Sequence, residues 1–368
     1  MSLPPLFAPM TAAGWSAAGL QQAWAAIPLG SIFGALLAPH LIRSWGTQNT
    51  ISAASTVAAI AVIARVVAVE PTSLALALLV YGAATGVLLA VLTTVVGLLA
   101  APDRAGLAQG IFFGAYALGA AISVAFAEAL LQFFDWRSVC VVIGLSSLLV
   151  AFTSMRTKSL GARTAGSSDI GNSSGSRVGA LLLTLRYSAA YASYVGGYLA
   201  LTGLLPYQLE RWGWPRTEAN LSLAVMTIAF LIGASVWTAI TDAHGGRKPT
   251  FALTLLIAGA STAAIPFVVG DHPNLPSWLV LVAVGLFSGG MAVFFPLLLG
   301  DRRLGVLQGE RSTGYATAAS YAGGMCAPLL LANTSVSQPD LAICIFGILI
   351  VLAGVLVPGA APADHASR

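Results

Sequence analysis

Charged residues are scarce in this chain. Asp, Glu, Lys and Arg make up 8% of its 368 residues, whereas a soluble domain carries about a quarter. Hydrophobic residues make up 57%, and the mean hydropathy is +0.86. So few charges cannot cover a surface that faces water, which excludes a soluble domain. The composition predicts an all-α polytopic membrane protein, each span of which needs about 20 apolar residues.

Residues that bind metals or carry out catalysis are also few. The three cysteines stand singly in apolar stretches, and the four histidines fall at helix ends, in loops or in the tail. Neither set has the spacing of a disulfide framework or a metal site. The chain also lacks the Gly-Lys-Ser/Thr loop that binds ATP. We therefore expect no enzyme, no cofactor and no metal, since a membrane-embedded enzyme needs such side chains converging at one depth.

Positive charges are distributed unequally along the chain. Hydropathy predicts about eleven transmembrane spans, and most of the 17 Lys and Arg residues fall in the alternate loops on one side of them. This bias predicts a multi-pass protein of the inner (plasma) membrane, with the N-terminus outside and the C-terminus in the cytoplasm. The basic balance then reflects topology, so we expect no nucleic-acid partner. The predicted spans are 17–41, 49–69, 73–99, 106–133, 137–154, 180–206, 218–241, 249–269, 276–299, 312–333 and 340–358.

A pattern of glycines occurs twice in the chain at the same internal spacing. Each copy starts with a Gly-Trp pair and continues with two further glycines. In a membrane protein, repetition of this kind predicts two pseudo-symmetric helical bundles packed around a site at the midplane. The first copy consists of Gly14, Trp15, Gly34 and Gly46, and the second of Gly213, Trp214, Gly233 and Gly245.

A polar stretch of small residues at 155–179 divides the spans. Such a stretch cannot bury a core and is typical of a flexible linker, here a cytoplasmic one. We therefore predict an N-terminal bundle of five helices at 1–154, a C-terminal bundle of six at 180–358 and a cytoplasmic tail at 359–368. Too few residues for a span precede the first Gly-Trp pair. We expect that Met1 is not the natural start and that a further span is encoded upstream.

The loop after the second glycine pattern carries a charged motif. Asp242 is followed by Gly245, Gly246, Arg247 and Lys248, which resembles the Asp-x-x-Gly-Arg-Arg loop of the major facilitator superfamily. In that family the loop joins the second and third helices of each half. The resemblance implies a transporter that lacks the usual first transmembrane helix. Further motifs carry it: Asp135-Trp136-Arg137, and the paired Tyr116-Ala117-x-Gly119 and Tyr321-Ala322-x-Gly324.

The first half departs from the family pattern. Arg43 stands where the family has Asp, which puts the contact between halves built on that Asp in doubt. Gly119 is not followed by the Pro that marks many proton-coupled drug antiporters, which disfavours drug efflux. The stretches at 26–28 and 38–39, with Arg65, resemble a cyanate-permease-like branch, whose substrates are small anions.

Four tyrosines recur along the span at 180–206, with a spacing that places them on one face of a helix. Phenols facing hydrocarbon each need a hydrogen-bond partner, and a wet cavity removes that requirement. The resemblance implies that this span is the family's seventh helix, which lines the central cavity. A packing interface with hydroxyls bonded to neighbouring helices is the alternative. The predicted cavity residues are Tyr187, Tyr191, Tyr194 and Tyr198, with Thr93 and Thr94, although either threonine could bond only to its own helix.

Two charged residues inside predicted spans are candidate contacts for a coupling proton or an anion. Glu128 is an acid within a span, where such groups are costly and mark function by default. Its alternative is hydration near the outer surface or pairing with Arg137. Arg65 lies near the outer end of its span, where it attracts an anionic substrate or extends to the interface.

The leading hypothesis is a secondary active transporter of a small solute that works by alternating access of two bundles. Its partners are then the solute, the lipid bilayer and, if transport is coupled to protons, a proton. A transport-dead or regulatory remnant of the same fold is the alternative, and a drug/proton antiporter is a further one. The predicted gating-loop residues are Gly34, Arg43, Gly46, Gly233, Asp242, Gly245, Arg247 and Lys248.

Overall fold

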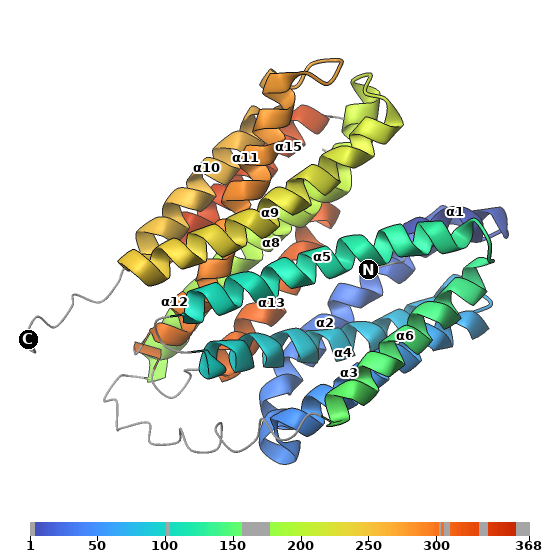
Figure 1. Ribbon diagram of the computed structural model, residues 1–368, viewed down its shortest axis with the longest axis horizontal. Helices are drawn as coiled ribbons and strands as arrows, with labels where there is room; N and C mark the ends of the chain where they lie inside the picture. Colours follow the sequence, from blue (N-terminus) through green and yellow to red (C-terminus); the bar gives the residue numbers. More distant parts are fainter. Residues whose placement is uncertain are drawn as a thin grey trace, which may run out of the picture.

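Figure 1 shows a computed structural model of the chain, which describes residues 4–100, 104–156, 177–301, 303–304, 310–330 and 338–357. All regular secondary structure in these ranges is helical, and eight of the helices are long and apolar enough to cross a membrane. The all-α membrane fold is therefore confirmed. The count of about eleven spans and the sides on which the termini lie stay predictions.

The first group of helices runs from α1 to α6. Local signals set its helix starts: the Ser16 side chain accepts a hydrogen bond from the Gly19 N–H, and Glu70 and Ser73 form a capping box around Pro71. The elements are α1 (Pro4–Ala12), α2 (Ala17–Trp45), α3 (Thr47–Ala64), η1 (Arg65–Val67), α4 (Pro71–Leu99), α5 (Ala105–Leu131) and α6 (Trp136–Arg156).

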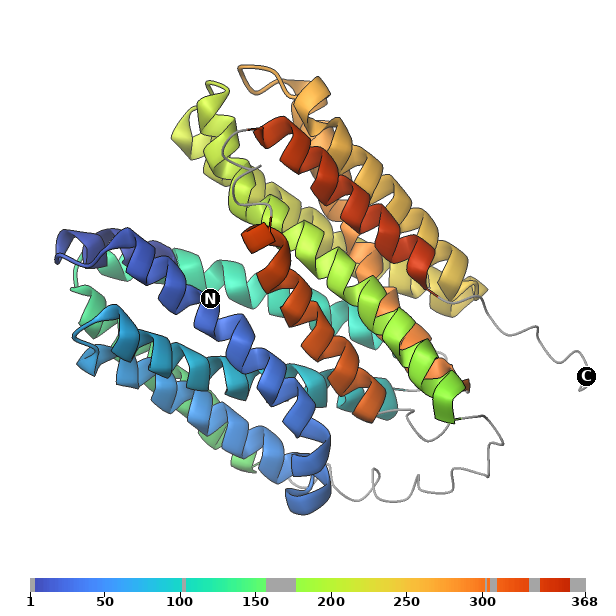
Figure 2. The same cartoon turned by 180° about the vertical axis from the view of Figure 1, so that it is seen from behind.

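The second group runs from α8 to α15. The elements of this group are α8 (Arg177–Arg211), α9 (Arg216–His244), α10 (Arg247–Val268), α11 (Leu275–Ser288), η2 (Gly289–Val293), α12 (Phe294–Gly300), α13 (Glu310–Leu330) and α15 (Pro339–Leu356). The two groups converge at the end where α5, α8 and α13 begin, and they diverge toward the turn between α8 and α9 (Figures 1 and 2).

Two predicted boundaries need correction. The helix at 276–299 is not continuous, because a 3-10 segment separates α11 from α12. Its first residue, Gly289, touches the backbone of α9, and Pro296 cannot donate the hydrogen bond of a regular turn. The linker prediction at 155–179 was also too wide at both ends, since α6 continues to Arg156 and α8 begins at Arg177. The division into two bundles, linker and tail otherwise stays a prediction.

The repeated glycines occupy matching structural positions. Gly46 and Gly245 each follow a long helix with positive φ, at 79° and 73°, a conformation that side chains other than glycine rarely adopt. Gly34 and Gly233 lie where helices touch. A Cβ atom on Gly34 would approach the Ala83 carbonyl oxygen of α4 to 1.9 Å. The repeat in the sequence therefore records backbone geometry that both halves need.

The two groups contact each other through two pseudo-symmetric helix crossings. In one, α5 crosses α9, and a Cβ on Gly110 would lie 2.4 Å from the Ala234 carbonyl oxygen. In the other, α13 crosses α2, and a Cβ on Gly314 would lie 2.8 Å from the Ala35 carbonyl oxygen. Ala35 and Ala234 hold the same position of the repeat. The crossings lie toward the end rich in Arg and Lys, which we call the basic end.

Candidate substrate site and gate

Two tyrosines of the predicted stripe use their hydroxyls in bonds to the segment from α11 to the end of α12. Tyr187 Oη donates to Asp301 Oδ2 at 2.9 Å, and Tyr194 Oη donates to the Ser288 carbonyl oxygen at 3.2 Å. Both side chains are buried. These bonds are of the kind that the packing alternative requires, so Tyr187 and Tyr194 fasten α8 to its neighbours.

The other two tyrosines of the stripe make aromatic contacts. The Tyr191 ring stacks on Phe294 with centroids 4.8 Å apart, and Tyr198 stacks on Tyr194 at 5.6 Å. Tyr198 also lies 6.0 Å from Phe230 of α9. Such pairs add about 0.5–1.5 kcal/mol beyond the area that they bury. They place Tyr191 beside the 3-10 break and Tyr198 beside α9.

Four tyrosines from four helices lie near one another where the two groups come together. Tyr321 of α13 is within electrostatic range of Tyr81 of α4, Tyr116 of α5 and Tyr191 of α8, and its hydroxyl pairs with Ser31 of α2. Tyr116 is 43% exposed. We call Tyr81, Tyr116, Tyr191 and Tyr321 the central tyrosine cluster. Of these four tyrosines, the sequence analysis predicts only Tyr191 as a cavity residue. Two of the others, Tyr116 and Tyr321, begin the paired Tyr-Ala-x-Gly motifs.

Arg65 lies next to this cluster. Its guanidinium carbon is 4.7 Å from the centre of the Tyr81 ring, and the residue is only 2% exposed. It therefore does not extend to the surface. Its Nε atom has no hydrogen-bond partner among the atoms that the structure describes. A buried cation with an unused donor is costly without a compensating group, which makes it a candidate anion contact.

The remaining candidates within spans lie elsewhere. The Thr93 and Thr94 hydroxyls are buried and donate to carbonyl oxygens one turn back along α4, at 2.7 and 2.9 Å. Both hydroxyls therefore bond to their own helix, which is the alternative to the cavity role in the sequence analysis. Glu128 belongs to α5, and its side chain lies outside what the structure describes.

Asp242 joins the two groups at the basic end. Its carboxylate accepts the backbone N–H of Leu107 at 2.7 Å and that of Gly106 at 3.1 Å, both in the first turn of α5. Arg247, from the start of α10, donates to the same carboxylate at 3.3 Å. A negative charge is stabilised at a helix N-terminus by the free N–H groups there. The neighbouring Lys248 is half-buried in the first turn of α10.

A second carboxylate, Asp301, lies beyond the end of α12 on the same side. It accepts hydrogen bonds from Tyr187 and from two nitrogens of Arg303, at 2.9 and 2.7 Å. Burial alone would raise the pKa of Asp301, but the hydrogen bonds from Arg303 and Tyr187 outweigh it and lower the pKa. Asp301 therefore stays ionised and holds α8 to the end of α12.

Comparison with known proteins agrees with this architecture. Residues 1–169 match the family model described as Major Facilitator Superfamily. The fucose:proton symporter FucP of E. coli has the same fold, with a TM-score of 0.68 at 19% identity over 96% of this chain and 92% of that one. The first part of the chain thus matches the major facilitator superfamily, and the chain as a whole has the fold of its transporters. It is a multi-pass membrane protein, and the family model and the structures that it resembles are those of transporters and not of enzymes.

Two further solved structures of transporters are similar. One is FucP in the outward conformation, with a TM-score of 0.67 at 19% identity over 97% of this chain and 96% of that one. The other is the human organic anion transporter MFSD10, with a TM-score of 0.68 at 13% identity over 93% of this chain and 83% of that one. At these identities the likeness concerns the fold alone.

One curated protein also matches, the fluoride-specific ion channel FluC of Bordetella pertussis. It is 32% identical over 113 residues, which make up 30% of this chain and 84% of the channel. The match leaves most of the chain unaccounted for, whereas the superfamily fold covers 96% of it. Spans built from the same few apolar residues resemble one another by composition. We therefore assign no function from this similarity.

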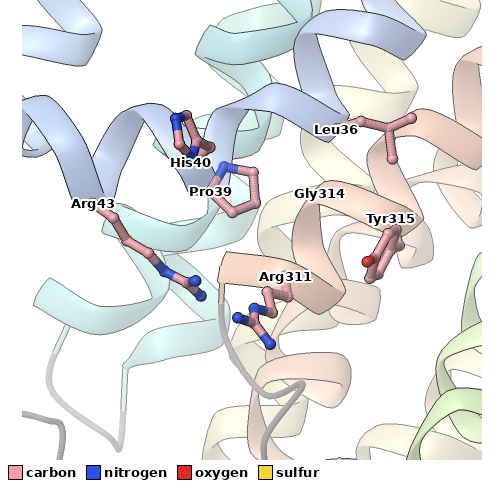
Figure 3. Close-up of a pocket in the computed structure, with 7 residues that line it drawn as sticks. All are labelled: Leu36, Pro39, His40, Arg43, Arg311, Gly314 and Tyr315. Atoms are coloured by element: carbon pink, nitrogen blue, oxygen red, sulfur yellow. The ribbon is translucent and has the colours of Figure 1, made fainter.

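In the predicted gating loop, Arg43 is where the first half of the chain departs from the second. It lies at the end of α2 at the repeat position that Asp242 holds at the end of α9. Among the residues whose side chains the structure describes, the α2–α13 crossing therefore has no counterpart of the carboxylate that closes the α5–α9 crossing. A pocket lies there, lined by Leu36, Pro39, His40, Arg43, Arg311, Gly314 and Tyr315 (Figure 3).

Proposed function

We propose that the protein is a secondary active transporter of a small polar solute, working by alternating access of its two bundles in the inner (plasma) membrane. The central tyrosine cluster supports this proposal. Its hydroxyls come from α4 and α5 of the first group and from α8 and α13 of the second. A solute bound there contacts both bundles, so its binding free energy can shift the equilibrium between their orientations.

The solute that this site favours is a small organic anion. Arg65 supplies a buried positive charge beside Tyr81, with an Nε donor unused among the described atoms. The phenols of the cluster supply donors for the oxygens of a carboxylate or hydroxyl group. An anion that neutralises Arg65 removes the cost of a buried unpaired charge, which gives the site a preference for anions over neutral analogues.

The conformation described here is closed at the basic end, which the charge bias predicts to be cytoplasmic. The bond from Leu107 to Asp242 and the stacking of Phe113 on Phe295, 5.5 Å apart, both join the groups toward that end. Opening the basic end must break these contacts. In this proposal the solute enters from the opposite side, where the groups diverge (Figure 1).

Transport by the purified protein in proteoliposomes tests the function. We expect saturable uptake of a sugar acid such as galacturonate, and weaker uptake of the neutral sugar fucose. The double variant Tyr116→Phe, Tyr321→Phe removes two cluster hydroxyls and should raise the KM at least about tenfold, as expected for two lost hydrogen bonds. Tyr207→Phe, at an exposed position of α8, is the matched control. A protein that moves no organic anion, sugar or cationic drug supports the transport-dead alternative.

Proton coupling is tested separately with Glu128. If its carboxyl carries the coupling proton, Glu128→Gln abolishes accumulation driven by a pH gradient and leaves solute exchange intact. Glu210→Gln, at the exposed end of α8, serves as the control. Gradient-driven accumulation that survives in the Glu128 variant would assign the coupling to another group.

A further inference from the structure

The pocket between α2 and α13 is positively charged. Arg43 of α2 and Arg311 of the first turn of α13 point toward each other there, and His40 of α2 also belongs to the lining (Figure 3). None of the residues that the structure assigns to its lining is Asp or Glu. Among the described residues, no salt bridge involves Arg43 or Arg311. Two cations therefore face one space with no described negative charge between them.

The repeat shows what this space lacks. At the matching crossing, Asp242 binds the first turn of α5. The close contact of Gly110 with Ala234 corresponds to that of Gly314 with Ala35. In this correspondence Arg43 replaces Asp242 and Arg311 replaces Leu107. The α2–α13 crossing thus has a cation on both helices where the α5–α9 crossing has a carboxylate bound to backbone N–H groups.

The shape and chemistry of the pocket suit a phosphate group. Its volume is about 280 Å³, and Tyr315 adds a hydroxyl to the cationic wall. Arginine presents several N–H groups in a planar fork, which matches the oxygens of phosphate. A phosphate bound by Arg43 and Arg311 together would bridge α2 and α13, as Asp242 bridges α9 and α5.

We propose that this pocket binds a phosphate-type anion, which supplies the negative charge missing from the first half and favours the state closed at the basic end. The anion acts on the gate and is separate from the transported solute. Because it binds the closed state in preference to the open one, it shifts the equilibrium toward closure. The phosphate comes either from solution or from the headgroup of an anionic lipid, since the pocket lies at the end of α2, which is long and apolar enough to cross a membrane.

Thermal unfolding of the purified full chain in neutral detergent tests binding. Inorganic phosphate, titrated at constant ionic strength, should raise the Tm in a saturable manner. Arg43→Gln and Arg311→Gln should each raise the apparent Kd at least about tenfold, because each removes a charge-assisted bond. Arg216→Gln, an exposed cation of α9 at the opposite end, should leave the Kd unchanged. No Tm shift with phosphate and none in the lipid arm below would overturn the proposal.

The source of the phosphate is resolved by lipid composition. The same proteins are placed in nanodiscs of phosphatidylcholine, with or without phosphatidylglycerol. Stabilisation by phosphatidylglycerol that is lost in Arg43→Gln identifies a headgroup. Stabilisation by inorganic phosphate in pure phosphatidylcholine discs identifies the free anion.

Two substitutions keep the proposal falsifiable if the Gln variants fold poorly. Arg43→Asp installs the carboxylate that the other half has, so its Tm should match that of the phosphate-saturated protein and no longer respond to phosphate. A second substitution, Glu310→Gln, tests whether the chain's own Glu310 carboxylate takes the place of phosphate; the structure does not describe this side chain. If its carboxylate already neutralises the pocket, phosphate stabilises only Glu310→Gln, which would contradict the proposal. Both outcomes concern unfolding alone, so they stay interpretable whether or not the protein transports a solute.

Discussion

The Leu107 backbone N–H and the Asp242 carboxylate are joined by a 2.7 Å hydrogen bond that links the first helix group to the second. The Asp242 side chain is only 7% exposed, and Arg247 holds it from the other side. The bond is charge-assisted and sits at a helix start, where N–H groups lack partners within the helix. Because the carboxylate is buried, water competes little for this bond, and the bond holds the basic end closed.

Replacing Asp242 with Asn should loosen this closure. The variant keeps the size of the side chain but loses the charge, so the bonds to Gly106 and Leu107 weaken and Arg247 loses its partner. Charge-assisted bonds contribute about 1.5–3 kcal/mol each, and we expect a lower Tm together with faster labelling of thiols introduced at the basic end. Glu210→Gln changes an exposed acid and should alter neither. An unchanged Tm in Asp242→Asn would mean that the bond adds no stability.

A methyl group at the α2–α4 contact should be poorly tolerated. In Gly34→Ala, the new Cβ would lie 1.9 Å from the Ala83 carbonyl oxygen, so the two helices must separate. Overpacking of this kind costs about 1–3 kcal/mol. Gly203→Ala is the matched control, because nothing lies within 4 Å of a Cβ there and Ala favours a helix interior by about 0.5–1 kcal/mol. Thermal unfolding should show a lower Tm for the first variant and an equal or higher one for the second.

The Asp301 carboxylate should make stability depend on pH in the acid range. Its pKa in the folded protein lies below the ordinary value because hydrogen bonds from Arg303 and Tyr187 outweigh burial. A lowered pKa stabilises the fold above the unfolded-state value of about 3.9, and this stabilisation is lost as pH falls through the folded-state value. The Tm difference between the wild type and Asp301→Asn should therefore be full near neutral pH and shrink below about pH 4. A difference that stays constant across this range would exclude the carboxylate as its source.

Much of the fold was predictable because lipid imposes simple rules. Apolar length and the charge bias were enough for the helical membrane class, and the repeated glycines marked positions where both halves need positive φ or close contact. The break between α11 and α12 was missed because Gly289 contacts α9, which is distant in the sequence. Hydropathy registers the apolar character of such a segment but not its tertiary neighbours.

The site was less predictable for a related reason. Helical periodicity placed four tyrosines on one face of α8, but it could not say which element that face meets. The structure brings Tyr191 to a cluster with tyrosines of three other helices, while Tyr194 bonds to Ser288. Membership of the cluster depends on how the two halves pack. In the sequence, only the paired motifs that begin at Tyr116 and Tyr321 pointed to members of the cluster outside α8.

Tyr191 and Tyr194 should respond differently to removal of their hydroxyls. The Tyr194 hydroxyl donates to the buried Ser288 carbonyl oxygen, so Tyr194→Phe leaves that acceptor with one bond fewer and should lower the Tm. The Tyr191 hydroxyl interacts with Tyr116 and Ser320 at the junction of the two groups. In the proposed site, Tyr191→Phe should therefore weaken solute binding, a loss that Tyr194→Phe should not show. Solute affinity from uptake kinetics, measured beside thermal unfolding for each variant, separates the two roles. Equal affinity in both variants would remove α8 from the site and leave all four of its tyrosines with a packing role.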